Sequence, residues 1–162
     1  MLEYRYNNKW LCLVNKYGLS FKNEYTQLHL PNALSSTLQN GVIECKSDAG
    51  DYYMLKLLPF FYVITYNKFE FFYDSLTENE YSNNKIVFKV GKYIRHTLMK
   101  SISFCHRLSK ILPKSQAFNI IMSIDEDYVT ISFHKIRIGE TWLEDSLEEY
   151  QLDAVLVMTI LR

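Results

Sequence analysis

The chain has 162 residues, of which 48% are apolar, a level typical of a folded globular protein rather than a disordered one. This length is sufficient to bury a core without disulfides or metals, so we expect a single domain spanning residues 1–162. The net charge is zero. A neutral chain lacks the overall basic excess of a nucleic-acid-binding protein, so no direct nucleic-acid binding is expected.

Charge is nevertheless segregated along the chain. Residues 85–112 contain seven basic and no acidic residues, whereas residues 113–162 contain four basic and nine acidic residues. Two arrangements explain this pattern: the basic and acidic regions face each other, or they face solvent apart.

No membrane-directed segment is predicted. The first residues are polar and charged, and the longest apolar stretch, 54–66, contains Lys56 and Pro59 and is too short to cross a bilayer. We therefore expect a cytoplasmic protein with no membrane partner.

Cysteine and histidine spacing indicates neither a disulfide framework nor a metal site. Cys12, Cys45 and Cys105 are odd in number and widely spaced, so we expect buried, reduced thiols. The four histidines have no metal-ligand spacing, and no glycine-rich phosphate loop occurs. We therefore predict no catalytic residues, no metal, no cofactor and no enzymatic activity.

The first half of the chain is predicted to contain short strands and loops. The run 10–14 predicts a first strand and 15–18 a turn, while 35–41 is a loop or a single helical turn. Strands are expected at 41–46, 52–58, 60–66 and 69–73, with a hairpin turn at 48–51. Residues 76–84 are polar and predict an exposed loop.

Residues 92–112 form the clearest predicted helix. Apolar residues recur there at intervals of three and four, and Pro113 ends the pattern; the stripe is Ile94, Leu98, Ile102, Cys105, Leu108 and Leu112. The basic residues off this stripe suit the helix dipole, which is a simpler explanation than nucleic-acid contact.

The remaining elements complete an α+β fold. Residues 117–124 and 128–138 alternate as an antiparallel hairpin, and 154–161 predicts a central strand buried on both faces. We predict a mostly antiparallel β-sheet packed against one long helix, about 92–112, and short helices.

Residues 140–150 predict a short acidic helix. Leu143, Leu147 and Tyr150 would share one face of it. Glu144 stacks on Glu148, and Asp145 on Glu149, at the i,i+4 spacing where like charges repel. The acidic face is either solvated or a surface for a cationic partner.

The C-terminal region resembles one protein family. The residues that carry the resemblance are Ile138-Gly139-Glu140-Thr141-Trp142-Leu143, Leu147-Glu148-Glu149-Tyr150 and the apolar run 153–157. This pattern is similar to the C-terminal signature of immunity proteins from bacterial contact-dependent growth inhibition systems. The resemblance covers residues 136–157 and implies a cytosolic protein that binds and neutralises one cognate toxin, usually a nuclease.

The resemblance suggests an acidic toxin-binding surface. A nuclease must carry a basic site for the phosphate backbone of its nucleic-acid substrate, and carboxylates can cover that site. The candidate contacts, with Trp142 or Tyr150 as an aromatic anchor, are Asp125, Glu126, Asp127, Glu140, Trp142, Glu144, Asp145, Glu148, Glu149 and Tyr150. Both aromatic residues are also typical of core positions, so the motif can mark the scaffold rather than the contact surface. The alternative hypothesis is a small cytosolic enzyme or subunit that uses a pocket between the helix and the sheet.

Overall fold

The computed structural model describes residues 1–22, 25, 28–56 and 73–161, which form an α+β fold. A five-stranded sheet has the order β1-β7-β5-β6-β4, and β2 and β3 form a separate hairpin; every neighbouring pair is antiparallel. The strands are β1 (Leu2–Tyr6), β2 (Val42–Ser47), β3 (Gly50–Leu55), β4 (Ile86–Lys89), β5 (Phe118–Ile124), β6 (Tyr128–Lys135) and β7 (Ala154–Ile160). The helices in the described residues are α1 (Asn8–Tyr17), α2 (Asn32–Asn40), α3 (Leu76–Asn83), α4 (Ile94–Ile111) and the short 3-10 helix η1 (Leu147–Glu149).

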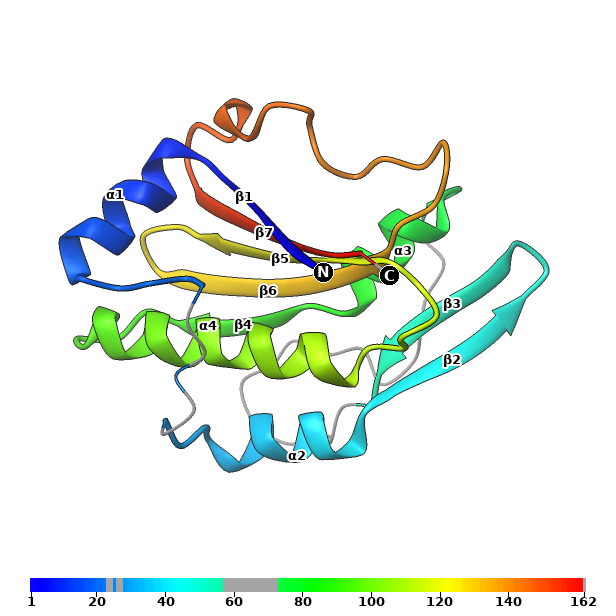
Figure 1. Ribbon diagram of the computed structural model, residues 1–162, viewed down its shortest axis with the longest axis horizontal. Coiled ribbons are helices and arrows are strands. Elements are labelled where there is room, and N and C mark those ends of the chain that lie inside the picture. The colour runs from blue at the N-terminus through cyan, green and yellow to red at the C-terminus, as the bar shows by residue number, and fades with distance from the viewer. Residues whose placement is uncertain (23–24, 26–27, 57–72, 162) are drawn as a thin grey trace.

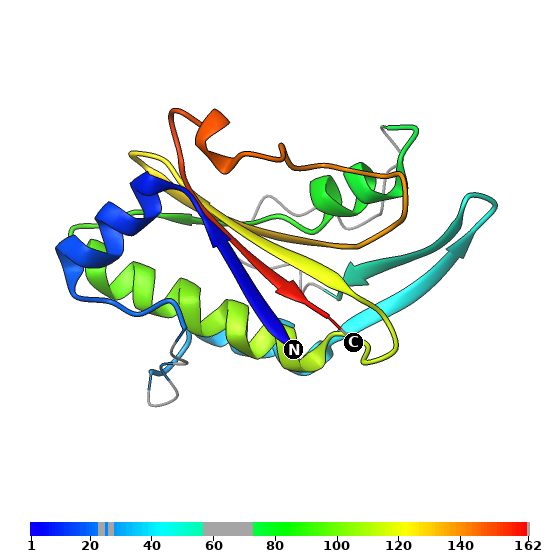
Figure 2. The same ribbon diagram turned by 45° about the horizontal axis from the view of Figure 1, so that its top comes forward.

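The sheet is covered on both faces. Helices α4 and α2 lie on one face, while α3 and the segment 136–153 lie on the other (Figure 1, Figure 2). Helix α1 directly follows β1 and packs at the end of the sheet where β7 begins. The main core lies under α4, and a smaller apolar cluster lies under 136–153.

The main core confirms the predicted apolar stripe. Leu98, Ile102, Cys105, Leu108 and Leu112 are all buried in it. The helix that carries them, α4, has 18 residues. It is the longest of the described helices, but α2 packs beside it on the same face of the sheet. The fold therefore contains several helices and no single dominant long helix among the described residues.

The segment 136–153 crosses the sheet. Strands β6 and β7 are both antiparallel to β5, so they run parallel to each other and their connection must return along the length of a strand. A strand of seven residues is about 23 Å long, a distance that the 18 residues of this segment can cover with or without a helix.

The structure contradicts the acidic helix predicted at 140–150. The segment is irregular, with turns and bends, and only η1 is helical. The repulsion of like charges at i,i+4 weakens the local preference for a longer helix.

The strand predicted at 10–14 is also wrong, because these residues belong to α1. Asn7 caps the helix by accepting a hydrogen bond from the Trp10 amide, and Gly18 ends it at a left-handed φ of 59°. The predicted turn at 15–18 is therefore a helix C-terminus. A short apolar run does not by itself distinguish a strand from a buried helical face.

Two segments are more helical than predicted. Residues 35–41, predicted as a loop or a single helical turn, belong largely to the nine-residue helix α2. Residues 76–84 belong largely to α3, whose buried residues contradict the predicted exposed loop. Ser75 caps α3 by accepting a hydrogen bond from the Glu78 amide, which is the Ser-x-x-Glu pattern of a helix start.

Several other predictions are confirmed. The hairpins β2–β3 and β5–β6 form with their turns near the predicted positions, and β7 lies inside the sheet with most of its residues buried. The strands predicted at 60–66 and 69–73, and the end of the one at 52–58, fall largely outside the described residues.

The cysteine prediction holds for one of the three thiols. Cys105 is buried, but Cys12 is exposed and Cys45 is half-buried. Burial raises the pKa of the Cys105 thiol far above its usual value. Over the described residues, no helix has the length and apolar character needed to cross a membrane.

Asn7 offers a direct test of how the segment 136–153, which we call the crossover, is held against the start of α1. Its side chain accepts hydrogen bonds from the Trp10 and Val155 amides, both at 3.0 Å, and donates to the Asp153 carbonyl at 2.8 Å. Asn7→Ala removes a helix cap and leaves buried groups unpaired, so unfolding in urea should show a loss of about 2–4 kcal/mol. The exposed neighbour provides the control: Asn8→Ala should change stability by less than about 0.5 kcal/mol. Equal losses in the two variants would contradict this role.

Candidate functional site

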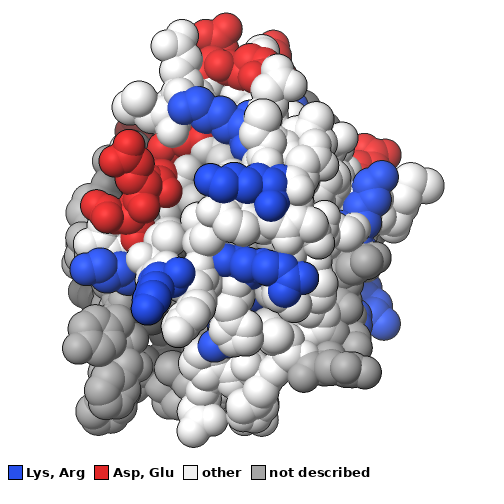
Figure 3. Space-filling view, turned by 90° about the vertical axis from the view of Figure 1, so that its left-hand side faces the viewer, with Lys and Arg blue, Asp and Glu red and all other residues white. Residues whose placement is uncertain are grey.

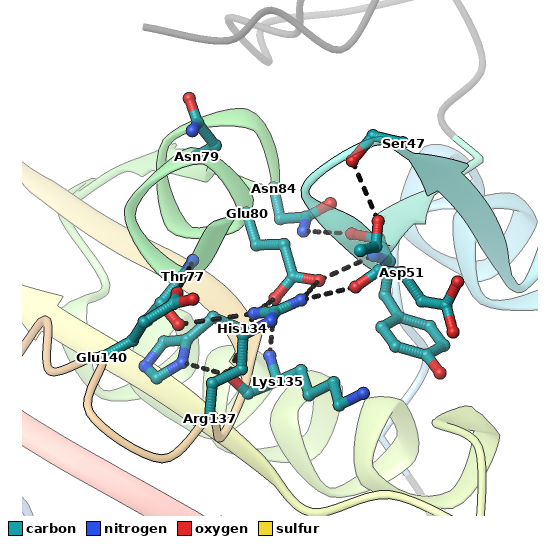
Figure 4. A network of polar contacts seen from close by, with 12 residues as sticks. Ser47, Asp51, Thr77, Asn79, Glu80, Asn84, His134, Lys135, Arg137 and Glu140 are labelled. Atoms are coloured by element: carbon teal, nitrogen blue, oxygen red, sulfur yellow. Dashed lines mark hydrogen bonds and ion pairs between the residues drawn. The ribbon is translucent and has the colours of Figure 1, made fainter. Parts of the chain in front are cut away.

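Glu80 and Arg137 form a buried ion pair beside the acidic segment (Figure 4). The two guanidinium nitrogens of Arg137 each donate to one carboxylate oxygen of Glu80 at 2.8 Å. The Glu80 side chain is 0% exposed and the Arg137 side chain 12%. Such a two-point contact fixes the orientation of both groups as well as their separation.

Glu80 also binds the backbone of two strands that no ladder connects. Its carboxylate accepts hydrogen bonds from the Tyr53 amide of β3 and the Lys135 amide of β6, both at 2.7 Å. Arg137 donates to the Asp51 carbonyl of β3 at 2.8 Å. Asn84 continues the pattern, accepting from the Leu55 amide and donating to the Tyr53 carbonyl. Side chains that belong to or flank α3 thus satisfy a strand edge that would otherwise lack partners.

Glu140, a candidate contact residue, caps α3 instead. Its carboxylate accepts hydrogen bonds from the Thr77 amide at 2.8 Å and the Ser75 hydroxyl at 3.2 Å. Burial alone would raise the pKa of Glu140, but the hydrogen bonds from Thr77 and Ser75 and the charge of Arg137 outweigh it and hold the pKa below its usual value. The structure therefore places Glu140 in the scaffold.

Trp142 and Tyr150 pack against the second face of the sheet. Trp142 stacks on Tyr81 of α3, with ring centroids 4.3 Å apart and an interplanar angle of 29°. Both Trp142 and Tyr150 adjoin the small buried cluster on this face, which consists of Ile121, Leu147, Val155 and Val157. The motif aromatics are half-buried and help to fix the crossover on the sheet.

Three exposed acidic residues of the crossover line a depression. Glu144, Asp145 and Glu149 line it together with Tyr150, and its open volume is about 680 Å³. The Glu144 amide donates to the Tyr150 hydroxyl at 3.3 Å, which joins two residues of the lining. No lysine or arginine appears in this described lining. Such a surface can accept cationic side chains.

Glu148 lies beside this depression but has a structural contact. One of its carboxylate oxygens accepts a hydrogen bond from the Asn8 amide at 2.9 Å, at the start of α1. A carboxylate is favourable there because the helix N-terminus carries partial positive charge.

The second group of candidates, Asp125, Glu126 and Asp127, lies apart in the β5–β6 turn. Asp125 closes the turn by accepting hydrogen bonds from the Asp127 and Tyr128 amides at 2.7 and 2.6 Å. A groove of about 550 Å³ borders this turn and is lined by Lys9 and Lys16 of α1 as well as by Asp125 and Glu126.

The predicted acidic residues therefore do not form one continuous surface. Figure 3 shows separate groups of acidic side chains on this side of the molecule, with lysine and arginine side chains across the middle. The structure brings together Glu144, Asp145, Glu148 and Glu149, and it separates them from the β5–β6 turn. No group of three His, Cys, Asp or Glu side chains within the described ranges is placed to hold a metal ion.

Sequence reasoning missed His134, which is only 3% exposed. Its Nδ1 lies 3.0 Å from the Lys135 carbonyl, and its Nε2 has no hydrogen-bond partner. Burial, with a smaller contribution from the charge of Arg137, lowers the pKa of His134 to about 4, although the hydrogen bond to the Lys135 carbonyl and the charge of Glu140 oppose the shift. The alternation of 128–138 could have placed His134 on a buried face, but it did not reveal the missing partner.

Glu80 was also missed, because 76–84 was interpreted as an exposed loop. The Ser75 and Glu78 capping pattern is a sequence signal for a helix there. No local signal in the sequence pairs Glu80 with Arg137, since 57 positions separate them.

The site and fold define an α+β domain whose two parallel strands are joined by an acidic crossover. The chain belongs to the Uncharacterized protein PM0498 family, whose family model matches residues 15–161. No curated protein and no solved structure matches the chain significantly.

The Glu80–Arg137 pair predicts a specific pattern of stability. Glu80→Gln leaves a buried guanidinium without its counter-charge and should cost about 3–5 kcal/mol. Arg137→Met should cost a similar amount, and the double variant should cost clearly less than the sum of the two. Urea unfolding of the four proteins measures the coupling, and Glu78→Gln on the same helix serves as the control, with an expected change within about 0.5 kcal/mol. Additive losses would contradict the pairing.

His134 predicts a loss of stability in mild acid. Its folded pKa of about 4 lies below the unfolded value near 6.5, so the unfolded chain takes up a proton first as the pH falls. The stability present above pH 6.5 should decline toward pH 4 by up to roughly 3 kcal/mol. His134→Phe should remove this dependence of stability on pH. The measurement is the unfolding free energy of wild type and variant at each pH, and the difference between the two should change between pH 6.5 and pH 4. The exposed His96→Gln should leave the slope unchanged.

Proposed function

We propose that this chain is an immunity protein of a contact-dependent growth inhibition system. In this proposal it binds a cognate toxin domain in the cytoplasm of the producing cell and neutralises it, with a nuclease as the toxin. The chain acts by binding and contributes no catalytic group.

The acidic depression on the crossover carries the proposal. Glu144, Asp145 and Glu149 line it, and Glu148 lies beside it. The motif residues between and around them have a structural role, since Glu140 caps α3 and Trp142 and Leu147 cover the sheet. Because these motif residues pack inward, the exposed acidic positions can differ without disturbing the scaffold, as an inhibitor that must match its own toxin requires.

Charge complementarity gives this surface a mechanism. A nuclease site that binds a phosphate backbone presents lysine and arginine side chains, and these are the groups an anionic depression accepts. Opposite potentials also accelerate the encounter, which matters for a protein that must intercept a toxin soon after its entry. Tyr150 at the rim offers an aromatic surface for contact.

The groove beside α1 supports the alternative function as a small enzyme. It is lined by Cys12 and Lys9 together with Asp125, and its volume is of the size that holds a small ligand. It lies between α1, the start of α4 and the β5–β6 turn, rather than between the length of α4 and the sheet. Loss of an activity on changing Cys12 or Lys9 alone would favour this function.

The deciding experiment is growth rescue. An immunity gene should lie directly downstream of the toxin-encoding end of a large exported adhesin. Cells that express that toxin domain should grow only when this chain is co-expressed, and the two proteins should co-purify. Growth arrest despite co-expression, with no complex, would contradict the proposal.

The depression can be tested by charge reversal. Glu144→Lys, Asp145→Lys and Glu149→Lys together should abolish rescue and weaken toxin binding by roughly 100-fold or more, because repulsion replaces attraction at the interface. The matched control carries Asp48→Lys, Glu126→Lys and Asp127→Lys, which change the net charge equally at exposed turns elsewhere. The control should retain rescue, and both proteins should keep the wild-type melting temperature within a few degrees. Loss of binding in the control alone would move the interface to the β5–β6 turn.

A further inference from the structure

Among the described residues, strand β1 is an open edge of the sheet. It is the terminal strand in the order β1-β7-β5-β6-β4, and β7 is the one described strand beside it (Figure 1, Figure 2). Its sequence is Leu2-Glu3-Tyr4-Arg5-Tyr6, and four of these five residues are exposed. An open edge presents amide and carbonyl groups that can pair with another strand.

The register with β7 shows which backbone groups point outward. The Asn7 amide donates to the Val155 carbonyl, and the Leu161 amide donates to the Met1 carbonyl. These bonds make the odd-numbered residues the hydrogen-bonded pairs of the β1–β7 ladder. The amides and carbonyls of Leu2, Tyr4 and Tyr6 therefore point away from β7.

The side chains of β1 divide between the two faces. The rings of Tyr4 and Tyr6 both contact Phe21 on the face that α4 covers. Glu3 and Arg5 lie on the opposite face, where both are exposed. Neither forms an ion pair or a side-chain hydrogen bond with any residue of the described ranges.

We propose that two copies of this chain pair through β1, antiparallel, about a twofold axis at Tyr4. In this register Tyr4 faces the second copy's Tyr4 and Leu2 faces the second copy's Tyr6, and both pairs use the outward backbone groups. Glu3 then lies opposite the second copy's Arg5, in a non-hydrogen-bonded pair where side chains approach most closely. The two sheets become one continuous sheet.

The charges select this register over its neighbours. Outward residues can pair only with outward residues, so the register shifts in steps of two. A shift in one direction places Glu3 opposite the second copy's Glu3, and a shift in the other places Arg5 opposite the second copy's Arg5. Each alternative sets like charges face to face, which is unfavourable, whereas the register centred on Tyr4 matches opposite charges twice.

Apolar contact adds to the charge pairing. Leu2 is 38% exposed and Tyr6 40%, and the pairing sets each against the other across the axis. The edge is short, so the interface is smaller than that of a stable dimer and its affinity should be low. We expect a reversible dimer with a dissociation constant on the order of 100 µM.

Charge exchange tests the register. Sedimentation equilibrium should show concentration-dependent dimers for wild type, and Glu3→Arg or Arg5→Glu alone should weaken dimerisation by about tenfold or more. The double variant restores opposite charges in both pairs and should return within about threefold of wild type. Inside the β1–β7 ladder Glu3 and Arg5 face only Thr159 and Val157, so all variants should melt like wild type.

Amide hydrogen exchange supplies a second readout. The Tyr4 and Tyr6 amides should exchange more slowly as protein concentration rises, while the Glu3 and Arg5 amides, already bonded to β7, should not change. A protein that remains monomeric at about 1 mM would overturn the proposal. Glu3 and Arg5 would then be charged residues that prevent the edge from pairing with another strand. A dimer whose dissociation constant is unchanged in both Glu3→Arg and Arg5→Glu would also overturn the proposal, because its interface would lie elsewhere. Neither outcome depends on toxin binding.

Discussion

The buried pair of Glu80 and Arg137 joins parts of the chain that no β-ladder connects. A buried ion pair is often no more stable than apolar residues of equal volume, because both charges lose water. Here the same carboxylate also accepts the Tyr53 and Lys135 amides, so it replaces the missing ladder between β3 and β6. The pair therefore determines where the β2–β3 hairpin sits, which apolar residues alone would not specify.

The position of the acidic surface follows from this anchor. Arg137 is fixed at the start of the crossover, and Glu140, three residues later, is bound to the start of α3. Trp142 then stacks on Tyr81 of the same helix. Leu147 is buried against the sheet, and Trp142, Leu143 and Tyr150 pack beside it, so the carboxylates between them are left exposed.

The sequence was sufficient where one periodicity dominates and insufficient where two signals compete. The stripe of α4 and the alternation of β5 and β6 have a single interpretation, and both elements were predicted. The run 10–14 suits a strand or a helix, and only the Asn7 cap and the Gly18 terminus decide for a helix. At 140–150 the apolar spacing favoured a helix and the like charges at i,i+4 opposed it. The structure instead holds the segment through contacts of Glu140 and Trp142 with α3, and such contacts between distant residues are not contained in local patterns.

The charge arrangement around the candidate site could also be predicted only in part. Segregation along the chain was evident from the sequence, and two spatial arrangements could explain it. In the structure α4 and the acidic crossover lie on opposite faces of the sheet, so the basic and acidic regions do not neutralise each other (Figure 2). Arg95 and Arg107 donate to backbone carbonyls of the segments beside α4. Among the described residues, the carboxylates around the depression have no protein donor apart from the Asn8 amide at Glu148. Their charge is therefore open to a cationic partner, which is what the proposed function requires.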